Sequence, residues 1–347
     1  MQHCLIQWLQ RPTLERDTNF VVQFGSLLSS DQGGVRKQNQ DRALAFECPP
    51  SRGAVSGSQV YILADGMGGM RDGDVCASTA VAAFAVSLLE NVDSSIDAAL
   101  RTAAERANRA VYEYASGSGG STLSALVIDR HGKGHAVNCG DSRIYAIDAK
   151  QGAIRLTIDD NLSERVGGGG RELVRFVGME EGFDCDLIAV NADQQRLVLT
   201  SDGVHFIAPE AFDAVARHAP TIRNFVERVT ALARWSGSPD NATIIAVDLD
   251  TRPVPSNTPK GLVLFQDAFS SVYFPMNASI GEPVRPNSEP AAPTIAPAAP
   301  APADVQSQAA ERKKRKRQAG KRRGSTPVQF EISAGLPLNT PESDDHR

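Results

Sequence analysis

The order of apolar segments along this chain predicts an α+β domain in which helices cover the outside of β-sheets. Short runs rich in β-branched residues, such as residues 59–64 and 196–200, have the composition of buried strands. Two pairs of segments carry apolar residues at helical spacing and lie between groups of these runs. The resulting order is strands, a helix pair, strands, a second helix pair and a final strand, which favours a layered sandwich.

The first helix pair is expected after residue 73. Residues 74–89 are rich in alanine with apolar residues at helical spacing. Ser94, with Asp97 three residues later, resembles a capping box that opens a helix reaching about residue 114. The remaining elements are expected as strands over residues 121–129, 134–139, 143–147 and 243–247 and as helices over residues 209–218 and 221–235.

Proline content separates a folded domain from a tail. Fourteen of the 20 prolines lie from residue 251 onward. Residues 282–310 hold too few large apolar side chains to offset the entropy of chain ordering. We therefore expect an N-terminal extension (residues 1–19), one folded domain (residues 20–250) and a largely disordered tail (residues 251–347).

The tail contains a basic cluster over residues 312–323, which holds nine of the 36 Lys and Arg residues. Without these nine, 27 basic residues stand against 41 acidic ones, a formal charge of −14. An acidic body suits cation binding, and a basic tail suits a polyanion or an acidic partner protein. Apolar islands in the tail are either docking segments that fold on binding or extra strands on the body: residues 262–265, 272–274 and 328–332.

The cysteines and the chain termini exclude several protein classes. Five cysteines, an odd number without close spacing, predict neither a zinc site nor a disulfide framework. The first ten residues lack the basic and apolar regions of a signal peptide, and no run of 18 apolar residues predicts a membrane span. We expect a cytoplasmic protein.

Three aspartates lie in separate tight turns beside predicted strands. Asp65 and Asp202 each follow a strand and precede a glycine, and Asp240 precedes the last strand. An aspartate followed by a glycine or asparagine is, on its own, equally well interpreted as an ordinary turn. Three carboxylates at strand ends are the oxygen ligands that a hard divalent cation requires. The pattern therefore predicts a metal-dependent hydrolase.

These aspartates belong to an ordered series of motifs: Val35-Arg36-Lys37-Gln38-Asn39-Gln40-Asp41, Asp65-Gly66-Met67-Gly68-Gly69, Gly119-Gly120-Ser121-Thr122, Asn138-Cys139-Gly140-Asp141-Ser142-Arg143, Ser201-Asp202-Gly203 and Asp240-Asn241-Ala242-Thr243. The series resembles the metal-dependent protein phosphatases of the type 2C class, in their bacterial form. The resemblance implies two antiparallel sheets packed face to face with helices on both outer faces. It also implies hydrolysis of phosphoserine and phosphothreonine in proteins by a metal-bridging water, and a kinase that shares the targets.

The resemblance implies a metal centre of two ions. Asp65 would bridge the ions, the Gly66 carbonyl would hold one, and Asp202 and Asp240 would hold the other. An all-oxygen ligand set favours Mn²⁺ or Mg²⁺ over zinc. Two such ions activate a bridging water and clamp the phosphoryl oxygens.

Three further residues receive roles from the resemblance. Arg36 would bind the phosphate, Asp41 would orient metal-bound water, and Asp141 would support a weaker third ion. Each has a simpler alternative: a solvated loop arginine for Arg36, a turn or N-cap residue for Asp41, and a turn aspartate paired with Arg143 for Asp141.

Several positions depart from the family pattern. Gln40 stands where a glutamate is usual, Phe206 where an aspartate often assists the third ion, and Asp160 where a histidine is common. Met67 replaces the histidine that serves animal members as a general acid, which makes His205 a candidate proton donor, or else a packed residue. These departures keep open a second interpretation, a weakly active or inactive phosphatase-fold scaffold whose tail binds a polyanion or partner protein.

Overall fold

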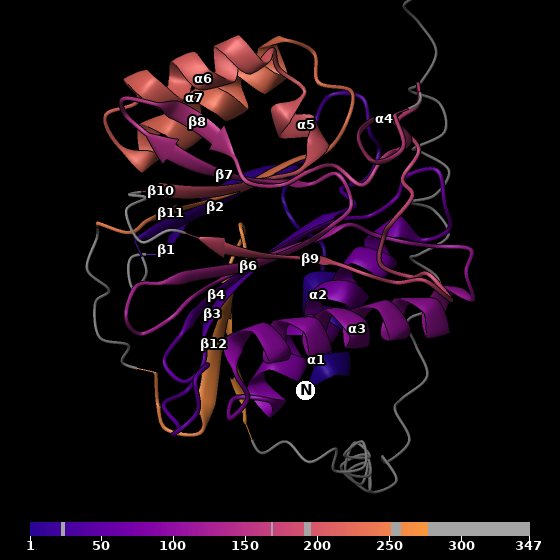
Figure 1. Ribbon diagram of the computed structural model, residues 1–347, viewed down its shortest axis with the longest axis vertical. Coiled ribbons are helices and arrows are strands. Elements are labelled where there is room, and N and C mark those ends of the chain that lie inside the picture. Colours follow the sequence, from indigo (N-terminus) through magenta and orange to yellow (C-terminus); the bar gives the residue numbers. More distant parts are fainter. Residues whose placement is uncertain (22–24, 168, 191–195, 251–257, 277–347) are drawn as a thin grey trace, which may run out of the picture. The chain divides into compact units, whose positions relative to one another are not determined.

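The computed structural model describes residues 1–21, 25–167, 169–190, 196–250 and 258–276. Within these residues the strands form two antiparallel sheets, with helices on both outer faces (Figure 1). This arrangement confirms the predicted α+β sandwich.

The two sheets carry the core of the protein between them. The first has the order β1 (Arg16–Val21), β2 (Ser26–Asp31), β11 (Ala242–Asp248), β10 (Arg196–Thr200), β7 (Arg143–Asp148) and β8 (Gly152–Arg155). The second has the order β13 (Ser271–Pro275), β12 (Leu262–Gln266), β3 (Asp41–Glu47), β4 (Gln59–Asp65), β5 (Leu123–Ile128), β6 (Gly134–Cys139) and β9 (Asp186–Val190). Inward-facing side chains of both sheets, among them Leu63, Leu199 and Ile245, are fully buried against one another.

Helices cover each sheet on its outer side, as Figure 1 shows. Helices α1 (Gln2–Leu9), α2 (Gly73–Glu90) and α3 (Ile96–Ala115) share a core with the second sheet. Helices α5 (Asp202–His205), α6 (Pro209–His218) and α7 (Ile222–Trp235) pack on the first sheet, and α4 (Leu162–Arg165) lies in the connection from β8 to β9. The predicted helix pairs are confirmed. The N-cap of α3 is Ser95, one residue after the predicted Ser94, and its hydroxyl accepts a hydrogen bond from the Ala98 amide at 3.4 Å.

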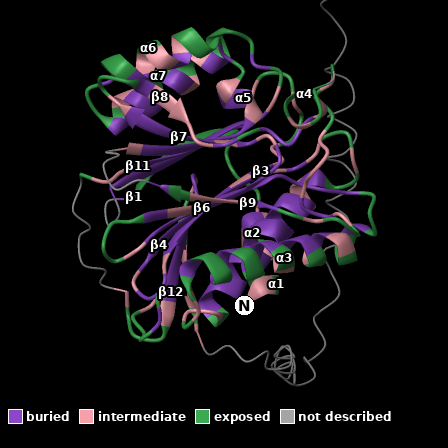
Figure 2. Cartoon of the chain, viewed as in Figure 1, coloured by how far each residue is buried: buried purple, intermediate pink, exposed green. Residues whose placement is uncertain are grey.

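Helix α2 is the one helix, in the part of the chain that the structure describes, that is long and apolar enough to cross a membrane. Most of it is buried inside the protein (Figure 2). It contacts α1, α3 and strand β4. Its apolar composition is accounted for by burial on nearly all sides.

The folded unit extends beyond residues 20–250 at both ends. It spans Met1–Pro283. Leu5 and Leu9 of α1 are buried in the core beside α2, and Phe265 of β12 packs on Phe46 with ring centroids 5.1 Å apart. The limits predicted at residues 20 and 250 therefore do not mark the ends of this unit, because segments this short show too few turns or alternations to be recognised by periodicity.

Two of the three apolar islands belong to the folded unit. Residues 262–265 and 272–274 lie in β12 and β13, which pair as an antiparallel hairpin. The alternative of extra strands on the body is therefore confirmed for them. The island at residues 328–332 and the basic cluster at residues 312–323 lie outside the described residues.

Candidate active site

Five aspartates gather at one edge of the sandwich because of the strand order. Asp41 begins β3 and lies opposite Asp65, the last residue of β4. In the first sheet, Asp202 follows β10, and Asp240 precedes β11, which is the antiparallel neighbour of β10. Asp141 lies in the turn that leads from β6 to β7, and so from one sheet to the other. The chain thus brings the aspartates of the sequence-predicted site to one place.

Burial and mutual repulsion raise the pKa values of these carboxyl groups. Burial raises the pKa of Asp202 to about 7, and the charges of Asp240 and Asp141 add to the effect. Burial raises the pKa of Asp41 to about 6 and that of Asp141 to about 6. The pKa of Asp65 lies well above its usual range because of burial and the neighbouring carboxylates of Asp41 and Asp202. A cluster of this kind is stabilised by bound cations.

The oxygen atoms of the cluster fit a divalent cation in their chemistry. Asp41 Oδ1 and Asp202 Oδ1 are buried and have no hydrogen-bond partner. Buried carboxylate oxygens without donors are suited to a hard cation. Among the described residues, however, no three His, Cys, Asp or Glu side chains form a metal-binding group. The side chains therefore supply suitable oxygens without being drawn together into one ligand shell.

Arg36 is half-buried and contacts this cluster through an ion pair with Asp240. Its Nη2 donates to Asp240 Oδ2 at 2.5 Å. This hydrogen bond, with the charge of Asp240, raises the pKa of Arg36 and keeps it protonated. A Cβ atom on Gly68 would lie 2.6 Å from Arg36 Nη1, so a larger residue there would displace the guanidinium from its present position.

The Asp-Gly turn itself is fixed by its neighbours. The Gly66 amide donates to the Gln40 carbonyl at 3.2 Å, and a Cβ atom on Gly66 would meet the Gly73 carbonyl oxygen at 2.1 Å. The Asp65 amide donates to Thr122 Oγ1 at 2.9 Å, and the Thr122 amide donates to the Asp65 carbonyl at 2.8 Å. These contacts hold Asp65 between β3 and β5.

Two polar residues that received no role from the sequence connect the site. Ser201 Oγ donates to Asp41 Oδ2 at 2.7 Å, which joins β10 to β3 across the two sheets. Asn241 accepts a hydrogen bond from the Gln40 amide at 2.8 Å, which joins the β11 turn to the loop before β3. Ser201 precedes Asp202 and Asn241 follows Asp240 in the sequence motifs. Their position next to a predicted metal ligand is the feature of the sequence that could have indicated a role in the site.

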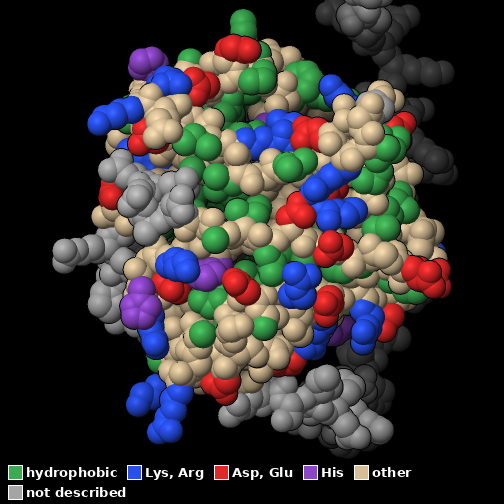
Figure 3. Space-filling model, in the orientation of Figure 1, with side chains coloured by type: hydrophobic (Ala, Val, Ile, Leu, Met, Phe, Trp, Pro, Cys, Tyr) green, Lys and Arg blue, Asp and Glu red, His purple; other side chains and the backbone are tan. Residues whose placement is uncertain are grey.

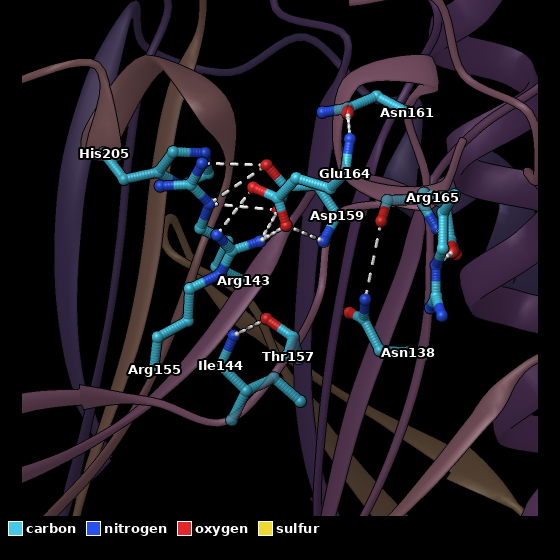
Figure 4. A network of polar contacts seen from close by, with 12 residues as sticks. Asn138, Arg143, Ile144, Arg155, Thr157, Asp159, Asn161, Glu164, Arg165 and His205 are labelled. Atoms are coloured by element: carbon cyan, nitrogen blue, oxygen red, sulfur yellow. Dashed lines mark hydrogen bonds and ion pairs between the residues drawn. The ribbon is translucent and has the colours of Figure 1, made fainter. Parts of the chain in front are cut away.

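The structure gives Arg143 and His205 hydrogen-bond partners that the sequence did not predict. Arg143 Nη2 donates to Asp159 Oδ2 at 2.8 Å instead of pairing with Asp141, and Arg155 pairs with the same Asp159 (Figure 4). His205 is half-buried and lines the groove beside Asp202, its Nδ1 lies 2.9 Å from Thr200 Oγ1, and desolvation holds its pKa well below the usual range. A lowered pKa leaves the imidazole neutral, which favours the interpretation of a packed residue over that of a proton donor.

Asp160 is fully buried, and its surroundings explain an acid at this position. Arg165 Nε donates to Asp160 Oδ1 at 2.7 Å and Arg175 Nε donates to the same atom at 2.8 Å. Its Oδ2 accepts a hydrogen bond from the Gly140 amide at 2.9 Å. Two arginines compensate the buried charge, and the contact to Gly140 fixes the turn that carries Asp141.

A groove of about 350 Å³ opens beside the aspartates. Asp141, Asp202 and Asp240 line one part of it. Phe206, which is 46% exposed, and Arg171 line another part. The groove therefore lies next to the carboxylate cluster and is lined by acidic, basic and uncharged side chains.

Comparison with known proteins identifies the family. Residues 36–239 match the family model described as protein phosphatase 2C. The serine/threonine phosphatase stp of Listeria monocytogenes is 27% identical over 64% of this chain and 94% of its own length. PstP, a serine/threonine protein phosphatase of Mycobacterium tuberculosis, is 26% identical over 63% of this chain and 44% of its own length.

A solved structure supports the same assignment. The PPM Ser-Thr phosphatase MsPP from Mycobacterium smegmatis, in complex with cacodylate, is similar with a TM-score of 0.53 and 26% identity. The match covers 64% of this chain and 97% of that chain. The chain therefore belongs to the protein phosphatase 2C family, whose members are metal-dependent, and is a serine/threonine phosphatase that acts on phosphoproteins.

Proposed function

We propose that this phosphatase works with two Mn²⁺ or Mg²⁺ ions held by Asp65, the Gly66 carbonyl, Asp202 and Asp240. The observation that carries the proposal is the gathering of aspartates around buried carboxylate oxygens without partners, Asp202 Oδ1 among them. When bound, the two ions supply a water activated for attack and neutralise the phosphoryl oxygens. A weaker third ion at Asp141 is part of the same proposal.

The residues of the chain would bind and orient the phosphate. Arg36 has a planar fork that fits two phosphoryl oxygens, and its contact with Asp240 keeps it at the cluster. Asp41 would orient the attacking water through its free Oδ1, while Ser201 holds its Oδ2 at 2.7 Å. The intact cluster favours an active enzyme over the scaffold interpretation.

Removal of metal tests this proposal. Phosphate release from a phosphothreonine peptide should require Mn²⁺ or Mg²⁺ and stop in excess chelator. Binding of Mn²⁺ should also weaken as the pH falls from 8 to 6, because Asp202 and Asp41, with pKa values raised to about 7 and about 6, take up protons there. The measurements are an activity assay and calorimetric titration at both pH values. Full activity in chelator would exclude the two-ion site.

The basic tail and the biological setting complete the proposal. Figure 3 shows acidic and basic side chains interspersed on one face of the folded unit, without a single large basic patch there. This distribution, with the nine basic residues at 312–323, favours the tail as the segment that binds a polyanion. We also propose a cytoplasmic location for this phosphatase. A kinase that shares its targets is expected from the resemblance to the family. Cell fractionation tests the location, and phosphopeptide profiling of a deletion strain tests whether the retained sites are those of one kinase.

Truncation separates the tail from catalysis. A variant that ends at Pro283 keeps the compact unit, including β12 and β13, and should retain peptide phosphatase activity and metal dependence. The full chain should bind heparin with an affinity that falls steeply with salt, because the cluster releases counterions on contact. The truncated form should bind weakly. Loss of peptide turnover in this variant, or heparin binding that salt does not weaken, would contradict the proposed division of roles.

A further inference from the structure

We propose that Asn241 is a positioning residue that sets the place of the phosphate-binding arginine. It would do so by holding residues 32–40, here called the Arg36 loop, against the start of β11. This inference rests on the proposed role of Arg36. The role of Asn241 is distinct from metal binding, because the hydrogen bonds of its side chain all go to the Arg36 loop.

The amide of Asn241 is bonded to three backbone groups of one loop. Nδ2 donates to the Gln32 carbonyl at 2.7 Å and to the Gln38 carbonyl at 3.1 Å, and Oδ1 accepts from the Gln40 amide at 2.8 Å. The residue is 2% exposed, so water does not replace these bonds. Bonds to both ends of the loop restrict its movement along and away from β11.

The contacts of Asn241 close a ring that includes Arg36. Gln32 Nε2 donates to the Arg36 carbonyl at 3.0 Å, so the loop residue held by Asn241 in turn holds Arg36. On the other side, the backbone N–H of Asn241 donates to Asp240 Oδ1 at 2.8 Å, and Arg36 Nη2 donates to Asp240 Oδ2. The backbone and the guanidinium of Arg36 are therefore both connected to the residue pair Asp240 and Asn241.

This ring has a consequence for substrate binding. A bidentate grip on phosphate depends on the position of the guanidinium, and a displacement of about 1 Å at such a group costs on the order of 100-fold in rate. Without the side-chain amide of Asn241, the Gln38 carbonyl and the backbone amide of Gln40 lose a hydrogen-bond partner, and the loop is free to shift. We therefore expect Asn241 to act on the substrate through Arg36.

A double-mutant comparison tests this route. Asn241→Ala should raise KM for a phosphothreonine peptide by roughly tenfold or more, with a smaller change in kcat. In a chain that already carries Arg36→Ala, the same change should cost less than about threefold, because residues that act through one group are not additive. Gln32→Leu, which removes the bond to the Arg36 carbonyl from a half-buried position, should show the same pattern more weakly. This second variant keeps the test available if Asn241→Ala does not fold.

Asn108 provides a matched control. It is also buried, and its amide also makes three hydrogen bonds to backbone groups, those of Gly178 and Met179, at 2.7–2.9 Å. Asn108→Ala should lower the melting temperature about as much as Asn241→Ala while it changes KM less than about twofold. Equal KM effects in the two variants, or a full Asn241 effect in the Arg36→Ala background, would overturn the inference. If Arg36→Ala alone leaves kcat/KM unchanged, the proposed role of Arg36 fails instead.

Discussion

Asp65→Asn should lower the turnover of a phosphothreonine peptide by about 10³-fold or more. The reason is that one carboxylate at the end of β4 is proposed to serve both ions, and their charge stabilisation supplies several kcal/mol of the barrier reduction. The measurement is kcat at saturating Mn²⁺, together with Mn²⁺ binding by calorimetry. Wild-type turnover in this variant would contradict the assignment of Asp65 as the bridging ligand.

The same variant should remain folded, which distinguishes lost chemistry from lost structure. The pKa of Asp65 is raised in the folded protein, so the group destabilises the metal-free fold as the pH rises above the pKa of the unfolded chain. Asp65→Asn removes this penalty and should raise the melting temperature in chelator at pH 8. Asp93→Asn, at an exposed position, is the control and should change neither turnover nor melting temperature.

Arg36→Ala should lower kcat/KM by roughly 1.5–3 kcal/mol, the range for hydrogen bonds to charged groups, or about 10- to 150-fold. Arg36→Lys keeps the charge without the planar fork and should fall between the mutant and wild type. Steady-state kinetics with a phosphothreonine peptide measures both. Equal kcat/KM values for Arg36→Ala and wild type would exclude a role in phosphate binding.

Metal binding provides the control for Arg36. Because its guanidinium bonds to Asp240 Oδ2, removal of Arg36 takes a positive charge away from a proposed metal ligand. The affinity for Mn²⁺ should therefore stay the same or increase. A marked loss of Mn²⁺ binding would show that Arg36 acts on the metal centre as a whole and not on the substrate.

The fold class was predictable from the sequence because it depends on local patterns. Residues 209–218 and 221–235 carry a strong helical period, and they form α6 and α7 at almost these limits. The strand at 134–139 is likewise found as β6 with the same limits. Helix α1 and the hairpin of β12 and β13 were not assigned to the folded unit, because eight-residue and five-residue segments depend on burial against distant partners.

The site was predictable in its residues and less so in its contacts. Asp65, Asp202 and Asp240 could be found because each adjoins a strand in a short turn, which is a local feature. The pairings of Arg143 with Asp159 and of His205 with Thr200 were not found, because several polar neighbours compete for each side chain and only packing selects among them.

The sequence by itself determined the sandwich, the candidate ligands and the family, since these follow from periodicity and from short motifs in a given order. Only the tertiary structure decided that Arg36 meets Asp240, that Asn241 holds the Arg36 loop and that Ser201 holds Asp41. Each of these contacts joins residues 160 or more positions apart, on strands from two different sheets or the loops between them. No local propensity specifies such a pair. The contact of Asn241 with Gln32 exists only after β2 and β11 have paired within the first sheet, and the contact of Ser201 with Asp41 exists only after both sheets have packed.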